Sequence, residues 1–136
     1  GKGALLREGR HAVLIALGPM VEQALRAAEL LEKRGCSVAV ADARFVKPLD
    51  EELLSKLLSS FPEAFTLEEN TLCGGFGAAV LEWAAMRGLK AQITPLAAPD
   101  RFIPHGKIAQ QRKDCMLDAD SIADTIHARL KNVIDL

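Results

Sequence analysis

Two adjacent carboxylates and a glycine-rich turn form the first segment of this sequence whose residue types suit chemistry. Glu68, Glu69 and Asn70 follow a short apolar run, and Gly75 and Gly77 come soon after them. A glycine-rich turn that opens a helix can hold a phosphate on its backbone N–H groups. The pattern GxGxxV lacks the third glycine of the dinucleotide fingerprint, and two carboxylates would repel a pyrophosphate. A tight turn with close helix packing is therefore the favoured interpretation.

Glu68 and Glu69 are also candidates for a general acid and base. Adjacent residues on an extended chain point to opposite faces, so the two carboxylates do not converge on one atom. We expect one of them to face inward and orient a neighbouring loop, while the other meets solvent. Contact with a partner domain is favoured over catalysis for this pair.

A second segment, residues 99–106, is dense in charged, aromatic and proline residues. Asp100 and Arg101 are expected to pair, and histidine, the residue type at His105, has an ordinary pKa near neutral pH. The prolines restrict the backbone, and the neighbouring Phe and Ile would point outward. The segment is interpreted as an ordered loop or a docking surface, in preference to a catalytic loop.

The cysteines give no sign of a metal site or a disulfide framework. Cys36, Cys73 and Cys115 are widely spaced and no CxxC occurs, so reduced thiols are the simplest account. Cys73 precedes a helix start, but nothing nearby supplies a base. No Ser/His/Asp set, Walker A loop or HExxH motif is present. We therefore expect no catalytic, cofactor-binding or metal-binding residue in this chain.

The elements that position these residues alternate between strands and helices. Apolar runs predict strands at 12–17, 37–41, 64–67 and 90–96. Amphipathic patterns predict a helix at 20–34 and a second helix with Asp50 as its N-cap. A third helix is predicted to follow the glycine-rich turn at 74–77 and to end near Arg87. A final helix is predicted from Asp118 or Asp120 onward to Val133. Residues 105–116 are interpreted as one short helix. The alternation predicts an α/β layered domain with a mostly parallel sheet, whose functional loops lie beyond the carboxyl ends of the strands.

Four loops fall at that predicted edge of the sheet, and the unusual residues cluster in them: 18–20, 42–50, 68–77 and 97–106. Asp42 and Arg44 are expected to pair at the end of the second strand. Together with Pro95 near the end of the predicted strand 90–96, Pro99 and Pro104 predict that the chain after Leu96 is a loop. His11 and His127 are expected to be solvated.

Length and charge bound the function classes. The chain has 136 residues, the size of one domain, and 17 basic against 18 acidic residues give a net charge of -1. That balance does not favour a nucleic-acid or membrane partner. No apolar run has the length of a membrane span and the start shows no signal-peptide pattern, so a cytoplasmic domain is expected. A first residue other than Met predicts a fragment of a longer protein.

At these loops the sequence resembles a known family. The strings DARFVKPLDEELL (42–54), LEEN (67–70), GGFGAAVLEW (74–83) and PDRFIPHG (99–106) are similar to the C-terminal domain of 1-deoxy-D-xylulose-5-phosphate synthases. The first two are shared loosely with other transketolase-like proteins, whereas PDRFIPHG is more specific. Residues 107–116 depart from the family pattern.

The resemblance implies a three-layer α/β/α domain with a mixed, mostly parallel five-stranded sheet in which one strand is antiparallel. It implies a parent enzyme that condenses pyruvate with D-glyceraldehyde 3-phosphate, losing CO2, for isoprenoid, thiamine and pyridoxal synthesis. Thiamine diphosphate and magnesium would be held by the preceding domains, since the GDG motif is absent from this chain. Two alternatives stay open: the docking domain of a 2-oxoacid dehydrogenase β subunit or a transketolase, and a stand-alone nucleotide-binding domain.

The implied partners are the preceding catalytic domains of the same chain and a second copy in a homodimer. The domain itself is expected to be structural. The residues assigned to interfaces or loop ordering are Glu68, Glu69, Asn70, Gly75, Gly77, Asp100, Arg101 and His105.

Overall fold

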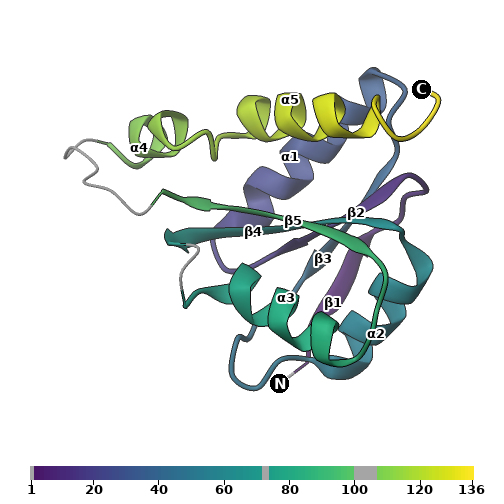
Figure 1. The fold of residues 1–136 in the computed structure, drawn as a ribbon. Coiled ribbons are helices and arrows are strands. Elements are labelled where there is room, and N and C mark those ends of the chain that lie inside the picture. Colours follow the sequence, from purple (N-terminus) through teal and green to yellow (C-terminus); the bar gives the residue numbers. More distant parts are fainter. Residues whose placement is uncertain (1, 72–73, 100–106) are drawn as a thin grey trace.

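A five-stranded mixed sheet forms the centre of the molecule (Figure 1). The structure is a computed structural model that describes residues 2–71, 74–99 and 107–136. Its strands are β1 (Ala4–Arg7), β2 (Ala12–Ala16), β3 (Val38–Asp42), β4 (Glu63–Thr71) and β5 (Gln92–Ala98). They lie in the order β1-β3-β2-β4-β5, and all neighbours are parallel except β1, which runs antiparallel to β3. The predicted mixed, mostly parallel sheet is confirmed.

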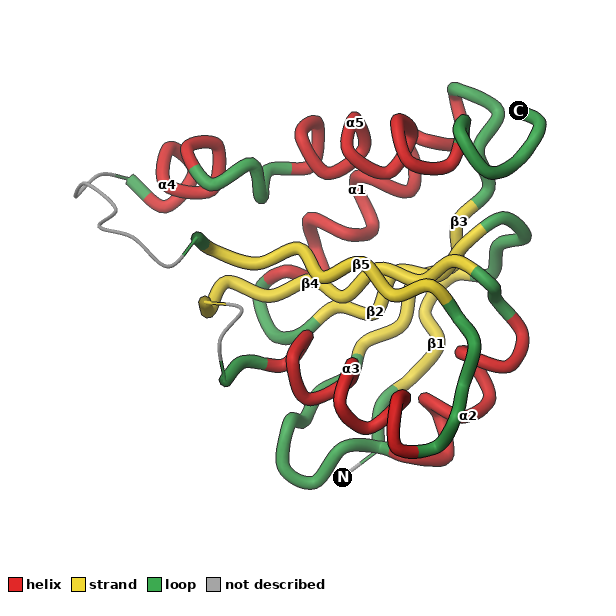
Figure 2. The backbone as a smooth tube through the Cα atoms, in the orientation of Figure 1, coloured by secondary structure: helices red, strands yellow, loops and turns green. Residues whose placement is uncertain are grey.

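Helices cover both faces of this sheet, which completes the predicted three-layer α/β/α arrangement (Figure 2). The helices are α1 (Met20–Lys33), α2 (Glu51–Ser60), α3 (Phe76–Met86), α4 (Ile108–Asp114) and α5 (Ala119–Leu130). Helices α1 and α5 pack on one face and α2 and α3 on the other, each with its own apolar cluster. Every residue of β2 is buried because the strand has helices on both sides.

The helix ends follow the capping residues that the sequence offers. The Leu53 N–H donates to Asp50 Oδ1 over 3.1 Å at the start of α2, and the Ser121 N–H donates to Asp118 Oδ2 over 3.3 Å at the start of α5. Gly35 follows α1 with a φ of +79°, a backbone conformation that glycine adopts without a steric penalty. These three positions were predicted from sequence.

Strand β1 was not predicted. It has only four residues, and two of them, Leu5 and Leu6, are exposed, so it lacks the continuous apolar run of a central strand. It pairs with β3 along one edge of the sheet, with an irregular register between Leu5 and Arg7. This is the antiparallel strand that completes the expected set of five.

Strands β4 and β5 both end later than the sequence predicted. Strand β4 continues past Leu67 to Thr71, through residues that were assigned to a loop because they are polar. Strand β5 continues past its predicted end at Leu96 to Ala98. It contains Pro95, as the predicted strand did, and Pro95 pairs with Thr66 of β4. A proline is tolerated there because β5 is an edge strand, and its missing N–H removes no hydrogen bond to a second neighbour.

The C-terminal region contains the short helix predicted within residues 105–116. Helix α4 has no buried residue, whereas α5 buries Ala119, Ile122, Ala123, Ile126 and Leu130. The last helix stops at Leu130, so its predicted extension to Val133 was wrong, and Val133 is exposed. None of the helices in the described ranges has the length and apolar character needed to cross a bilayer.

Candidate functional site

Strand β4 brings the two predicted carboxylates to the carboxyl edge of the sheet and separates them there. Glu68 is 1% exposed, and its carboxylate points into the molecule. The side chain of Glu69 is 39% exposed and lies on the other side of the strand. The alternation of side chains along an extended strand produces this split, which places the two groups out of reach of a common atom.

The Glu68 carboxylate caps the first turn of α3. The Phe76 N–H donates to Glu68 Oε1 over 2.8 Å, and the Gly77 N–H donates to Oε2 over 2.6 Å. Gly75, at the N-cap position, has no side chain with which to do this. The buried negative charge is therefore balanced by two N–H donors and by the positive end of the helix dipole.

Gly75 and Gly77 are required by the close approach of this carboxylate. A Cβ on Gly75 would collide with Glu68 Oε1 and lie 2.5 Å from the Thr71 carbonyl oxygen. A Cβ on Gly77 would lie 2.7 Å from Thr66 Oγ1 and 3.2 Å from Glu68 Oε2. The glycines thus let strand β4 and helix α3 meet through the carboxylate of Glu68.

This arrangement bears on the phosphate-cradle alternative. The N–H groups that would face a phosphate at the start of α3 are those that Glu68 already occupies. A pyrophosphate would have to displace a buried carboxylate and would be repelled by it. Thr66 Oγ1 is buried beside Gly77 and has no hydrogen-bond partner among the described residues. The first turn of α3 is therefore an internal junction and does not fit a nucleotide.

Glu69 faces a different helix. Arg112 of α4 donates to Glu69 Oε1 from Nε over 2.9 Å and from Nη2 over 2.7 Å. The two residues are 43 positions apart in the chain. This ion pair links the end of β4 to α4, on the face of the sheet opposite α3 (Figure 1).

A groove of about 350 Å³ lies beside this ion pair. Among the described residues, its lining consists of Pro19, Glu69, Ile108, Gln111, Arg112, Cys115 and Leu117. Its lining is mostly apolar, with the Glu69–Arg112 pair as the charged part of the rim. Pro19 follows β2 and Glu69 ends β4, so the groove opens at the carboxyl edge of the sheet.

The loop after β3 contributes a third set of polar contacts at this edge. The Arg44 N–H donates to Asp42 Oδ1 over 2.9 Å, and Arg44 Nε lies 3.7 Å from Asp42 Oδ2, as predicted for the pair. Asp50 also accepts a hydrogen bond from the Gly3 N–H over 2.8 Å, which sequence reasoning missed. The Leu53 and Gly3 N–H groups lower the pKa of the Asp50 carboxyl.

Asn70 is the remaining predicted site residue within the described ranges. Asn70 lies exposed on β4. Asp100, Arg101 and His105 lie outside the described residues, as does Cys73.

Sequence reasoning missed two further polar clusters. Between α2 and α3, Glu51 accepts hydrogen bonds from Trp83 Nε1 over 2.6 Å and from Arg87. Both bonds lower the pKa of the Glu51 carboxyl, and the bond from Trp83 has the larger effect. Arg87 also stacks over the Trp83 ring at 5.3 Å. The spacing of Trp83 and Arg87, one helical turn apart, was the only available hint.

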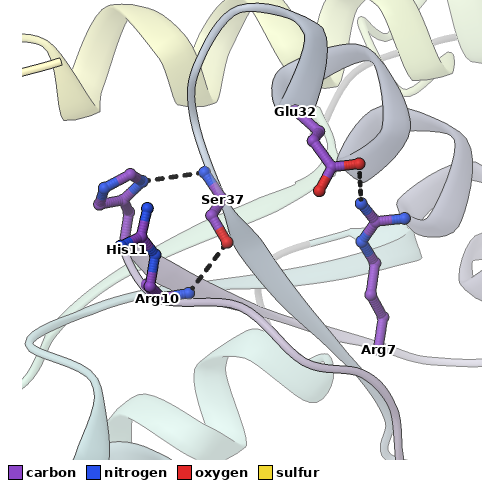
Figure 3. A network of polar contacts seen from close by, with 5 residues as sticks. All are labelled: Arg7, Arg10, His11, Glu32 and Ser37. Carbon is purple, nitrogen blue, oxygen red and sulfur yellow. Dashed lines mark hydrogen bonds and ion pairs between the residues drawn. The ribbon is translucent and has the colours of Figure 1, made fainter.

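The second cluster lies at the amino edge of the sheet (Figure 3). The Ser37 N–H donates to His11 Nδ1 over 2.8 Å, so His11 is a partly buried acceptor, and its prediction as a solvated residue was wrong. The Arg10 N–H donates to Ser37 Oγ over 3.2 Å, and Arg7 pairs with Glu32 at 2.9 Å. These contacts join the turn after β1 to the connection after α1.

Most of the chain matches one known protein family. Residues 1–122 match the family model described as Transketolase, C-terminal domain. The chain belongs to the transketolase C-terminal domain family. The three-layer fold and the antiparallel edge strand that the resemblance implied are the fold found here.

Curated relatives of this transketolase C-terminal domain include 1-deoxy-D-xylulose-5-phosphate synthases. The chain is 45% identical over 126 residues to the 1-deoxy-D-xylulose-5-phosphate synthase of Aquifex aeolicus, covering 93% of this chain and 20% of the relative. It is 47% identical over 131 residues to the synthase of Magnetococcus marinus, covering 93% and 21%. The chain therefore spans about a fifth of the length of the curated relatives it matches. These names do not favour the dehydrogenase alternative.

Solved structures agree on the fold of this transketolase C-terminal domain. A structure described as a split-gene transketolase in an inactive β4 tetramer matches with a TM-score of 0.87 and 28% identity, over 96% of this chain and 42% of that one. A transketolase mutant from Pichia stipitis matches with a TM-score of 0.69 over 98% of this chain and 18% of that one. At 17% identity, the second likeness shows the fold alone.

The first turn of α3 does not fit the pyrophosphate of thiamine diphosphate, the cofactor that the resemblance implies for the parent enzyme. The helix start at Phe76 and Gly77 is filled by Glu68, where a pyrophosphate would meet a like charge. Within 2–71, 74–99 and 107–136, no group of three or more His, Cys, Asp or Glu side chains is placed to hold a metal ion.

Proposed function

We propose that this chain is the C-terminal domain of a 1-deoxy-D-xylulose-5-phosphate synthase, a cytoplasmic homodimer dependent on thiamine diphosphate and magnesium. The whole enzyme would condense pyruvate with D-glyceraldehyde 3-phosphate and release CO2. One observation carries the proposal: relatives with that name are 40 to 47% identical over at least 90% of this chain.

The part of this domain in that enzyme is structural. It supports the dimer and buttresses the preceding catalytic domains, and its contacts are made by the loops 68–77 and 100–106. The capping of α3 by a buried carboxylate supports this role, because it fixes the end of β4 against the start of α3. An isolated 136-residue chain is expected to be inactive.

The reaction is tested on the whole polypeptide that contains this sequence. Pyruvate consumption is measured with thiamine diphosphate and Mg²⁺, in the presence and absence of D-glyceraldehyde 3-phosphate. Aldehyde-dependent turnover is expected. An intact, folded polypeptide that consumes pyruvate without any dependence on the aldehyde contradicts the proposal.

The structural role is tested with Arg101→Ala and His105→Ala in the same polypeptide. Each is expected to weaken dimer affinity or turnover by less than about tenfold, the effect of losing one rim contact. His127→Ala, on the outer helix α5, is the matched control and should change neither quantity. If dimer affinity and turnover also stay unchanged in the two loop variants, the assignment of residues 100–106 as a contact is wrong.

A further inference from the structure

Helix α3 differs from α1 and α2 in the residues that it turns toward solvent. Every exposed residue of α1 is charged, and every exposed residue of α2 is polar. The exposed residues of α3 are Leu81, Glu82, Ala85 and Met86, of which only Glu82 is polar. Met86 is 83% exposed. A helix that is apolar on all sides is typical of a protein interior, so α3 has the composition of a helix that is covered on both sides.

These residues form one face, which we call the outer face of α3: Ala78, Leu81, Glu82, Ala85 and Met86. Ala78, Leu81 and Ala85 recur at intervals of three and four positions, so their side chains lie along one side of the helix. Glu82 carries the one charge of this face, and no side chain of the described residues pairs with it. Few charges and an exposed methionine are typical of the centre of a protein–protein interface.

The start of the chain is held beside α3. The Gly3 N–H donates to Asp50 Oδ2 over 2.8 Å at the start of α2. The next residue, Glu51, accepts hydrogen bonds from Trp83 and Arg87 at the end of α3. Figure 1 shows the start of the chain on the same side of the sheet as α2 and α3. A polypeptide that precedes residue 1 therefore begins on the side of the sheet to which the outer face of α3 belongs.

The length of the relatives indicates what covers this face. The family model is that of a C-terminal domain, and the chain covers 20% of a curated relative, so most of such a polypeptide precedes residue 1. A segment tethered beside α3 has a high effective concentration at its outer face, an advantage that a separate molecule lacks. Covering Glu82 would leave an unpaired charge unless the segment supplies a cation. The required occupant is an apolar segment that carries a lysine or an arginine.

We propose that the outer face of α3 is a docking surface for the part of the same polypeptide that precedes residue 1, with a lysine or an arginine of that part paired to Glu82. The inference rests on the proposed place of this chain at the end of a longer enzyme. It adds a surface on the α2/α3 face of the sheet to the two loops assigned above (Figure 2).

Photo-cross-linking in the full-length polypeptide tests the occupant. Met86 is replaced by the photoreactive amino acid p-benzoylphenylalanine, and Ala128, which is exposed on α5 on the opposite face of the sheet, is replaced in the control. Position 86 should give a product with the mass of one polypeptide, whose cross-link maps to residues before residue 1. A product with the mass of two polypeptides, or a yield no higher than that at position 128, overturns the proposal.

A charge placed on the outer face gives an independent measurement. Ala85→Arg competes for Glu82 and repels the cation of the occupant, while α3 is kept because Ala85 is exposed and arginine is a good helix former. The variant should raise the rate at which thermolysin cleaves the full-length polypeptide just ahead of Gly3 by at least about tenfold, because the contact opens. Thermolysin does not cleave at arginine, so the substitution adds no site of its own.

Ala128→Arg places the same charge on an exposed alanine of α5 and is the matched control. It should leave the cleavage rate at the wild-type value. Equal rates in wild type and Ala85→Arg overturn the proposal.

The two proposals fail in distinguishable ways. Aldehyde-dependent turnover without a mapped cross-link from position 86 leaves the enzymatic proposal standing and overturns the docking surface. A mapped cross-link in a polypeptide without that turnover does the reverse.

Discussion

Glu68 and Glu69 are neighbours in the chain, yet they hold two helices in opposite ways. Glu68 is buried and bonds the backbone of α3, whose Phe76, Val80 and Ala84 are buried in the core. Glu69 is at the surface and pairs with the side chain of Arg112 on α4, which buries nothing. The end of β4 therefore holds α3 by buried hydrogen bonds and α4 by an ion pair at the surface.

The difference separates what the domain stabilises by itself from what it presents. The position of α3 is determined by apolar burial and by charge-assisted hydrogen bonds that water cannot replace. The position of α4 depends on an ion pair that salt screens and water competes with. A surface of the second kind is suited to being completed by a partner, and three predictions test this contrast.

The largest expected effect concerns the apolar anchors of the two helices. Phe76→Ala should lower the free energy of unfolding of the chain by about 3–5 kcal/mol, because it removes a buried ring and leaves a cavity. Ile108→Ala should change it by less than about 0.5 kcal/mol, since Ile108 is mostly exposed. Urea unfolding of both variants measures the difference. A loss of more than about 2 kcal/mol in Ile108→Ala would show that α4 belongs to the core.

The two carboxylates themselves give the next effect. Glu68→Ala should cost about 3 kcal/mol, because it leaves the Phe76 and Gly77 N–H groups buried without an acceptor. Glu69→Ala should cost less than about 1 kcal/mol, a loss that shrinks as salt is added. Glu68→Gln keeps an acceptor and should fall between them. The contrast between the carboxylates is broken if urea unfolding gives the Glu68→Ala and Glu69→Ala variants the same stability.

The smallest effect sharpens the contrast with an acid that caps a helix at the surface. Asp50→Ala should cost about 1 kcal/mol at pH 7. The Leu53 and Gly3 N–H groups lower the pKa of Asp50 in the folded state, so its contribution is complete above its unfolded pKa of about 3.9. The contribution is lost as the pH falls below that value and through the folded pKa, because the carboxyl then protonates.

Urea unfolding of wild type and Asp50→Ala at pH 7 and at progressively lower pH checks this expectation. The two proteins should converge in stability once the pH is below the folded pKa of Asp50. Glu52→Ala, which changes an exposed acid in the first turn of the same helix, is the control. A gap between Asp50→Ala and wild type that persists unchanged at the lowest pH at which both still fold would contradict the role of the charge.

Local chemistry accounts for what the sequence could predict here. Asp50 was recognised as a helix cap, and Asp118 as one of two candidates beside Asp120, because a cap depends on residues within one turn of it. The split of Glu68 and Glu69 to opposite sides was expected from strand geometry alone. The five-stranded topology came from the resemblance, since periodicity revealed only four of the strands.

Contacts between distant residues account for what the sequence could not predict. Nothing near Glu69 announces Arg112, 43 residues later, and nothing near Gly3 announces Asp50. Strand β4 was ended too early because Glu68 is polar, although its buried carboxylate is satisfied by α3. Strand β5 was ended at Leu96 because of the prolines around it, although it continues to Ala98. Pro95 is tolerated in it because β5 lies at an edge, which is a property of the whole sheet.

The antiparallel strand β1 has a consequence for how the domain is made. Strand β3 (Val38–Asp42) is almost fully apolar, and without β1 its free edge would offer unpaired backbone groups to any other extended chain. Because β1 precedes β3 in the chain, the ribosome synthesises the covering strand before it synthesises the strand whose edge is covered. Removal of residues 4–7 should therefore lower the soluble yield through aggregation, while the core of the protein that folds keeps its packing.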